Sequence, residues 1–129
     1  MAHLEIEYSP GLEQVCDIAR VCRELYEAMV RAGIFPLAGI RVRAYRADYA
    51  IVADNTEENN FLALTLSVGA GRTVEDLKAV GEMIFQTAQK ELRSLLATLH
   101  FALSLEIRVI DPALSWKDTP IHARLAGQN

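Results

Sequence analysis

Two arginines carry the clearest chemical signal in this 129-residue sequence. Arg41 belongs to an alternating stretch that predicts a strand, and Arg72 lies in the segment GAGRT, at the expected start of a helix. The helix dipole disfavours a positive charge at that end, so a basic residue there suggests a binding role. A guanidinium group matches a carboxylate with two parallel hydrogen bonds. The pair therefore indicates a carboxylate site; the alternatives are a solvated sheet edge, or ion pairs with Glu5, Glu7 or Glu75.

Other chemistries have weaker support. The histidines are scattered at positions 3, 100 and 122, and no H-x-x-x-H or C-x-x-C spacing occurs, so we expect no metal site. No G-x-S-x-G turn exposes a nucleophile. Cys16 and Cys22 lie six residues apart in one predicted helix and point to different sides, which predicts two buried free thiols and no disulfide.

The glycine-rich turn at residues 69–73 does not predict a nucleotide cofactor. It lacks the third glycine of a dinucleotide fingerprint and the acidic residue about 20 positions later. It does connect a predicted strand to a predicted helix, and the backbone N–H groups of such a turn can hold an anion. We therefore expect an anion site without a cofactor.

Composition narrows the classes of partner. The sequence has 13 basic and 17 acidic residues and a formal net charge of -4, which argues against nucleic-acid binding by phosphate neutralisation. It has neither an 18-residue apolar run nor a secretory signal pattern, so we expect a cytoplasmic protein without a membrane span. Apolar residues make up 51% and charged residues 23%, which favours self-association to cover apolar surface.

The first half of the chain predicts a strand, a helix and a strand. Residues 3–8 alternate between apolar and polar, which indicates a strand with one apolar face. Ser9 and Pro10 suggest the cap and first turn of a helix whose apolar stripe runs from Leu12 to Ala32. A second strand is expected over 38–47, with Arg41 and Arg43 on the face opposite to the apolar one.

The second half repeats this order. A strand is expected at 61–68, Thr73 is expected to cap a long helix with a leucine-rich stripe reaching Leu99, and a fourth strand is expected at 102–110. We therefore predict a single α/β (α+β) domain over 1–129, built from a duplicated β-α-β unit at about 3–47 and 61–110 and a tail at 111–129. Two helices should cover one face of a four-stranded sheet, and the other face then needs a partner.

Several long segments resemble one known family. The strings GIFPLAGIRVR (33–43), LTLSVGAGRTVEDLKAVGEMIF (64–85), HLEIEYS at the start and LSLEI (103–107) are similar to 5-carboxymethyl-2-hydroxymuconate isomerase, of the tautomerase superfamily. The resemblance implies a homotrimer of duplicated β-α-β subunits. It also implies a cofactor-independent reaction in homoprotocatechuate breakdown, in which proton transfer shifts a double bond in an unsaturated keto acid.

The resemblance also implies a site. The family's base is an amino-terminal proline exposed by removal of the initiator methionine, and Ala2 stands at that position here. Arg41 and Arg72 correspond to the arginines that bind a di- or tricarboxylate substrate, while His3 and Arg43 are candidate pocket residues. Nearby guanidinium groups would lower the pKa of an α-amine from its usual value of roughly 7.7 to 8.0. A freed Ala2 amine could act as the base, although it lacks the ring of proline; if Met1 stays, the nitrogen of Ala2 is an amide and cannot.

The departure at Ala2 keeps two alternatives open. One is a catalytically impaired or non-catalytic trimer that binds a carboxylate ligand. The other is a hydratase or decarboxylase built on the same fold, which the long GIFPLAGIR match makes the weaker of the two.

Overall fold

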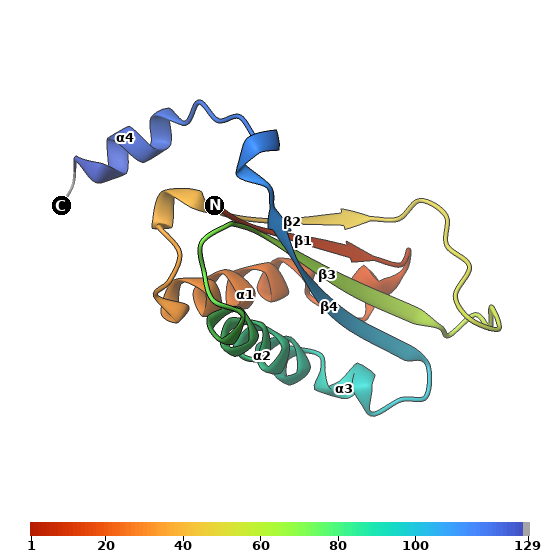
Figure 1. The fold of residues 1–129 in the computed structure, drawn as a ribbon. Coiled ribbons are helices and arrows are strands. Elements are labelled where there is room, and N and C mark those ends of the chain that lie inside the picture. The colour runs from red at the N-terminus through yellow and green to blue at the C-terminus, as the bar shows by residue number, and fades with distance from the viewer. Residues whose placement is uncertain (128–129) are drawn as a thin grey trace.

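The computed structural model describes residues 1–127, in which two long helices cover one face of a four-stranded sheet (Figure 1). The strands are β1 (Ala2–Tyr8), β2 (Ile40–Arg46), β3 (Asn60–Gly69) and β4 (Phe101–Ile110). The α-helices are α1 (Ile18–Ala32), α2 (Val74–Glu91), α3 (Arg93–Leu96) and α4 (Pro120–Ala126). Three short 3-10 helices complete the list: η1 (Leu12–Gln14), η2 (Leu37–Gly39) and η3 (Pro112–Leu114).

The sheet has the strand order β2-β1-β3-β4. β1 is parallel to β2, and β3 is parallel to β4, while β1 and β3 meet antiparallel in the centre. Each half of the chain is thus a parallel strand pair joined by a crossover helix, and the two halves join through their first strands. This arrangement confirms the predicted duplicated β-α-β fold.

The core forms between the sheet and the helices α1 and α2. Alternate residues of the two central strands point into it, because successive side chains of a strand face opposite sides of the sheet. Leu4, Ile6 and Leu66 are fully buried there, and Leu25 of α1 and Ile84 of α2 cover them. The predicted apolar faces of the strands and helices are therefore the ones that pack together.

The prediction for the start of the first helix was wrong. Ser9 does not cap a helix; its backbone and its hydroxyl both hydrogen bond to Phe61, so that it extends the pairing of β1 with β3. The chain then turns at Gly11, which has a φ of 97°, and α1 begins only after Asp17, whose carboxylate accepts a hydrogen bond from the Arg20 N–H. The Ser9 hydroxyl, which the local sequence predicted to cap a helix, therefore bonds to the neighbouring strand instead.

The second long helix begins as predicted and ends earlier. The Thr73 hydroxyl accepts a hydrogen bond from the Asp76 N–H, which is the predicted cap. The helix stops at Glu91, and the short α3 follows after Leu92. Leu99 is 97% exposed, so the apolar stripe does not continue to that position.

Within residues 1–127, nothing covers the face of the sheet away from the helices (Figure 1). Its residues are mostly polar, and Arg43 forms an ion pair with Glu5 across β2 and β1 at 2.5 Å. Beyond β4, the tail that the sequence left unassigned forms η3 and α4, and residues 128–129 of the predicted tail lie outside the described residues. None of the described helices has the length and apolar character that crossing a membrane requires.

Candidate active site

The sheet topology places the start of β1 in the middle of the sheet. Ala2 lies between Ile40 of β2 and Val68 of β3 and is completely buried. The carbonyl group of Met1 accepts a hydrogen bond from the Gly69 N–H at 3.2 Å. Since β1 is parallel to β2 and antiparallel to β3, its first residues lie beside the beginning of β2 and the end of β3. This pairing brings together the segments that carry the two predicted arginines.

A hollow of about 440 Å³ opens at this end of the sheet. It is lined by the first residue of the chain, the glycine-rich turn after β3, and the segment that follows β4. The lining residues are Met1, Gly69, Ala70, Arg72, Ile110, Pro112, Ser115 and Lys117.

Arg72 is held at the wall of this pocket by backbone oxygens. Its Nε and Nη2 donate to the Ile34 carbonyl at 3.3 and 3.0 Å, and its Nη1 donates to the Gly69 carbonyl at 3.2 Å. The guanidinium carbon lies 5.0 Å from the centre of the Phe35 ring, a distance typical of a cation–π contact. Within residues 1–127 no carboxylate forms an ion pair with Arg72. The group is therefore fixed in place while its charge stays available to an anion.

Arg41 lies beside His3 in the parallel register of β1 and β2. The Nη1 of Arg41 is 2.5 Å from the His3 Nε2. Since arginine can only donate, the His3 Nε2 is the acceptor and the ring is neutral. Burial, followed by the charges of Arg41 and Arg43, lowers the pKa of His3. Neither His3 nor Arg43 is among the residues that line the hollow, and Arg41 is not among them either. His3 contacts Arg41, while Arg43 pairs with Glu5.

The neutral His3 predicts a pH-dependent stability. An unfolded His3 titrates near 6.5 and the folded one lower, so the unfolded chain binds more protons as pH falls below 6.5 and stability decreases through that window. We expect His3→Gln to remove part of this decrease, by less than about 1 kcal/mol because the ring is only partly buried. Urea unfolding of both proteins at one concentration, between pH 7.5 and 5.5, measures it; identical pH dependence in the two would contradict the assignment.

The α-amino group of Met1 is the basic centre of the pocket. Burial lowers its pKa from 8.0, and the charges of Arg72, Lys117 and Arg41 lower it further. Gly39 of η2 lies against it: a Cβ at that position would come within 3.2 Å of the Met1 nitrogen. An amine in these surroundings is neutral at a lower pH than usual and can accept a proton there.

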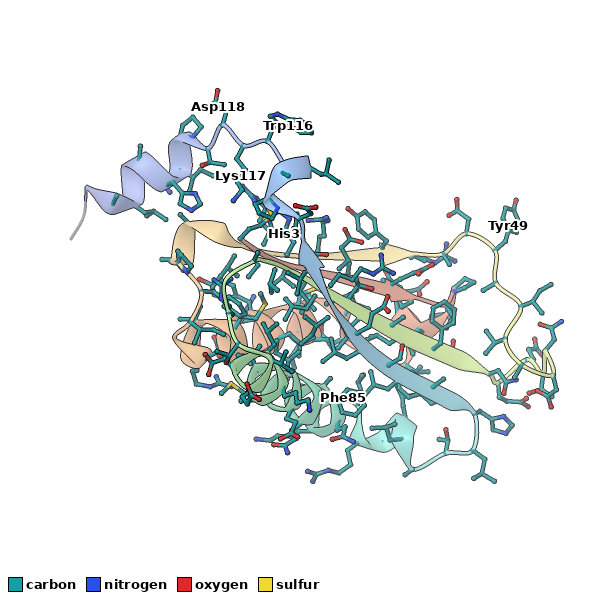
Figure 2. All side chains as sticks on the ribbon, in the orientation of Figure 1. His3, Tyr49, Phe85, Trp116, Lys117 and Asp118 are labelled. Atoms are coloured by element: carbon teal, nitrogen blue, oxygen red, sulfur yellow. The ribbon has the colours of Figure 1, made fainter. Side chains whose placement is uncertain are left out.

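Two residues near this pocket were not predicted from the sequence. Lys117 lines the pocket, and His122 of α4 lies beside Gly39, with its Cε1 3.8 Å from where a Cβ of Gly39 would lie. Both belong to the tail, which has too little periodicity to predict its path. Figure 2 shows Lys117 pointing from the tail toward the end of the sheet where His3 lies, while Trp116 and Asp118 point away.

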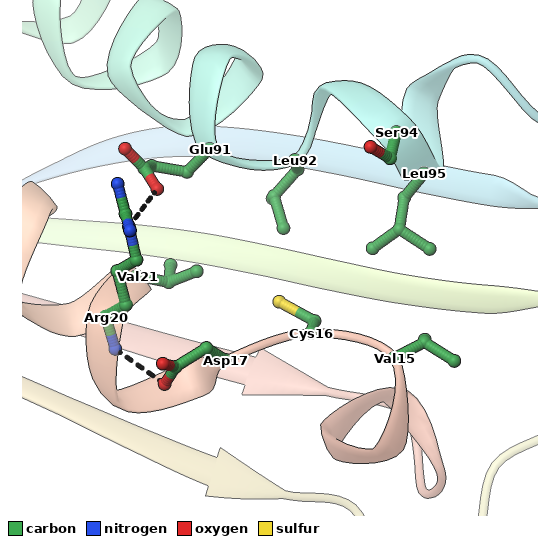
Figure 3. Close-up of a pocket in the computed structure, with 9 residues that line it drawn as sticks. All are labelled: Val15, Cys16, Asp17, Arg20, Val21, Glu91, Leu92, Ser94 and Leu95. Atoms are coloured by element: carbon green, nitrogen blue, oxygen red, sulfur yellow. Dashed lines mark hydrogen bonds and ion pairs between the residues drawn. The ribbon is translucent and has the colours of Figure 1, made fainter.

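A second hollow, of about 350 Å³, lies where α1 meets the end of α2 (Figure 3). Cys16 lines it, together with the ion pair that Arg20 forms with Glu91 at 3.0 Å. Burial raises the pKa of the Cys16 thiol and of the Cys22 thiol, so both stay protonated and are poor nucleophiles. The two cysteines are free, as predicted, although each is only partly buried.

The described part of the chain contains no group of three side chains arranged to hold a metal ion. At the pocket, an amine with a lowered pKa lies beside positively charged side chains. Such an arrangement can bind an anionic molecule, take a proton from it and stabilise the negative charge that results.

Comparisons with known proteins show the family to which the chain is similar. A family model described as 5-carboxymethyl-2-hydroxymuconate isomerase matches residues 2–125. The 5-carboxymethyl-2-hydroxymuconate Delta-isomerase of Escherichia coli is 32% identical over 123 residues, which cover 95% of this chain and 98% of that protein. A crystal structure of a 5-carboxymethyl-2-hydroxymuconate isomerase from Deinococcus radiodurans R1 has a TM-score of 0.87 and 35% identity, covering 96% of this chain and 93% of that one.

A more distant match shows the fold alone. A fused 4-OT asymmetric trimer has a TM-score of 0.68 at 19% identity, covering 95% of this chain and 98% of that one. The duplicated β-α-β arrangement is thus shared with a protein whose sequence is too different to indicate a common function.

Proposed function

The chain belongs to the 5-carboxymethyl-2-hydroxymuconate isomerase family, and we propose that it isomerises 5-carboxymethyl-2-hydroxymuconate or a closely similar carboxylated keto acid during the degradation of aromatic compounds. It is an isomerase by family. The observation that carries the choice of substrate is the pocket itself, in which an amine of lowered pKa lies among Arg72, Lys117 and Arg41. A substrate with several carboxylates matches this concentration of positive charge.

The proposed reaction moves a proton and shifts a double bond. In the hydroxy form of the substrate, the neutral amine takes the proton of the hydroxyl group and leaves a dienolate, whose negative charge lies mainly on that oxygen. The protonated amine then returns its proton to the carbon at the far end of the dienolate, so that the C–O bond becomes a carbonyl group and the remaining double bond is conjugated with it. Arg72 and Arg41 bind the carboxylates and stabilise the charged intermediate.

We assign the base to the α-amine of Ala2 after removal of Met1. Removal frees the nitrogen of Ala2, which otherwise forms the peptide bond to Met1, at the buried start of β1 between β2 and β3. Alanine lacks the ring that fixes φ in proline, so its amine is held less firmly. The test is an absorbance assay with 5-carboxymethyl-2-hydroxymuconate; steady turnover supports the proposal, and none from a chain verified by mass spectrometry to begin at Ala2 opposes it.

We further propose that the protein assembles as a homotrimer. The sheet face away from the helices is uncovered within residues 1–127, and Trp116, which is 86% exposed, lies in the tail. A structural relative that shares the fold is named as a trimer. Sedimentation equilibrium should give about three times the mass of 14.3 kDa; a monomer at micromolar concentration would contradict this assembly.

A second candidate function is a non-catalytic carboxylate-binding trimer. The observation in its favour is the alanine at position 2, which stands where the resemblance implies the family's proline. Calorimetric titration with a dicarboxylate separates the two functions: binding that is lost in Arg41→Ala, without turnover of any muconate-type substrate by the chain that begins at Ala2, would favour the binder.

A further inference from the structure

The tail after β4 forms a wall of the pocket. Pro112, Ser115 and Lys117 all line the hollow that contains the Met1 amine. Ser115 has an extended backbone, with φ of -135° and ψ of 128°, and successive residues of an extended segment point to opposite sides. This alternation separates Lys117, which faces the sheet, from Trp116 and Asp118, which face away (Figure 2).

The helix α4 holds this wall in place. It packs against η2, the short segment that lies directly beside Met1. His122 provides one such contact, since it lies next to Gly39. The tail is therefore attached on both sides of Lys117, to β4 before it and to η2 after it, and this attachment fixes which way the lysine points.

Lys117 has no partner for its charge among the described residues. Within residues 1–127 it forms neither an ion pair nor a side-chain hydrogen bond, whereas Arg43 and Arg46 are paired with acids. Lys117 thus adds a positive charge to that of Arg72 on the pocket wall, and the charge of Arg41 also acts on the Met1 amine. Muconate has two carboxylates, and a carboxymethyl substituent adds a third.

From this match we infer that Lys117 determines substrate specificity by binding the third carboxylate of a tricarboxylate, while Arg41 and Arg72 hold the other two. The inference rests on the proposed function. A lysine suits this role because it is a compact point charge that needs no bidentate geometry. It predicts that the enzyme prefers tricarboxylates over dicarboxylates and that this preference depends on one residue.

The test compares two substrates and three variants. In Lys117→Met, we expect KM for 5-carboxymethyl-2-hydroxymuconate to rise about tenfold, as for loss of one charge-assisted hydrogen bond, and KM for 2-hydroxymuconate to change less than about twofold. Lys117→Arg should restore most of the preference. Lys90→Met is the control, because it removes the same charge at the far end of α2 from Arg72.

Calorimetry keeps this test independent of turnover. The dissociation constants of tricarballylate and glutarate, a tricarboxylate and a dicarboxylate, are measured in the same proteins, and Lys117→Met should lower the preference for tricarballylate about tenfold. If wild type turns over neither muconate but shows this preference, the reaction assignment fails and the carboxylate subsite stands. An equal loss on both ligands, or an unchanged preference in Lys117→Met, would overturn the role of Lys117.

Discussion

A chain that begins at Ala2 is expected to isomerise 5-carboxymethyl-2-hydroxymuconate with a kcat about 100-fold or more above that of the same chain with Met1 retained. A positioned general base contributes roughly 10²- to 10⁴-fold, and the retained methionine converts the Ala2 nitrogen into an amide. The Met1 amine also lies in the pocket and has a lowered pKa, but it lies one residue before the Ala2 nitrogen, which displaces it by about 3.8 Å. A displaced base is poorly placed for a proton at the original site.

Two fusion proteins with a removable leader make this comparison, one leaving Ala2 and the other leaving Met1 as the first residue. Intact mass spectrometry verifies each product, and sedimentation verifies that both assemble alike. Ala2→Pro, prepared in the same way, should raise kcat further because the proline ring limits the orientations of the nitrogen. Equal kcat values for the two chains would show that the α-amine of Ala2 is not the base.

Replacement of Arg72 by alanine is expected to lower kcat/KM by about 10²- to 10³-fold, the usual loss for a group that stabilises charge in the transition state. The Arg72 guanidinium faces the pocket without an acidic partner in residues 1–127. Its removal also takes away the positive charge that, after burial, does most to lower the pKa of the amine. The rising limb of kcat/KM with pH should therefore move to higher pH in this variant.

Arg72→Lys distinguishes charge from geometry. It keeps a positive charge but cannot reproduce the hydrogen bonds to both the Ile34 and Gly69 carbonyls. We therefore expect the rising limb of kcat/KM to stay at the pH of the wild type, while KM increases. Arg20→Ala is the matched control, because Arg20 pairs with Glu91 outside the pocket. An Arg72→Ala enzyme with a wild-type kcat/KM, or with an unshifted pH limb, would contradict the assignment.

Hydrophobic periodicity predicted most of the fold because burial follows it. The alternation at Leu4 and Ile6 indicated the buried face of β1, and Thr73 with Asp76 indicated the start of α2. The start of α1 could not be predicted in this way. The hydroxyl of Ser9 bonds to Phe61, 52 residues later, and a contact between distant segments leaves no trace in local sequence.

The candidate site could be predicted only in part from local sequence. Arg41 was proposed because it lies in a predicted strand, and Arg72 because it lies at a predicted helix start. No pattern indicated that Arg41 would contact His3 or that Arg43 would pair with Glu5. Those contacts depend on the register of β1 and β2. The positions of Lys117 and His122 could not be predicted, because the packing of α4 on η2, rather than any periodicity, determines the path of the tail.

The central claim is that the α-amine of Ala2 is the proton-transferring base, and its titration tests that claim directly. In protein that begins at Ala2 and carries ¹⁵N-labelled alanine, NMR should report a pKa for this amine below 8.0. The surroundings that lower the pKa of the Met1 amine, namely burial followed by Arg72, Lys117 and Arg41, should act on it as well. The same pKa should govern the rising limb of kcat/KM. An amine that titrates at or above 8.0, or a kinetic limb at a different pH, would contradict the claim.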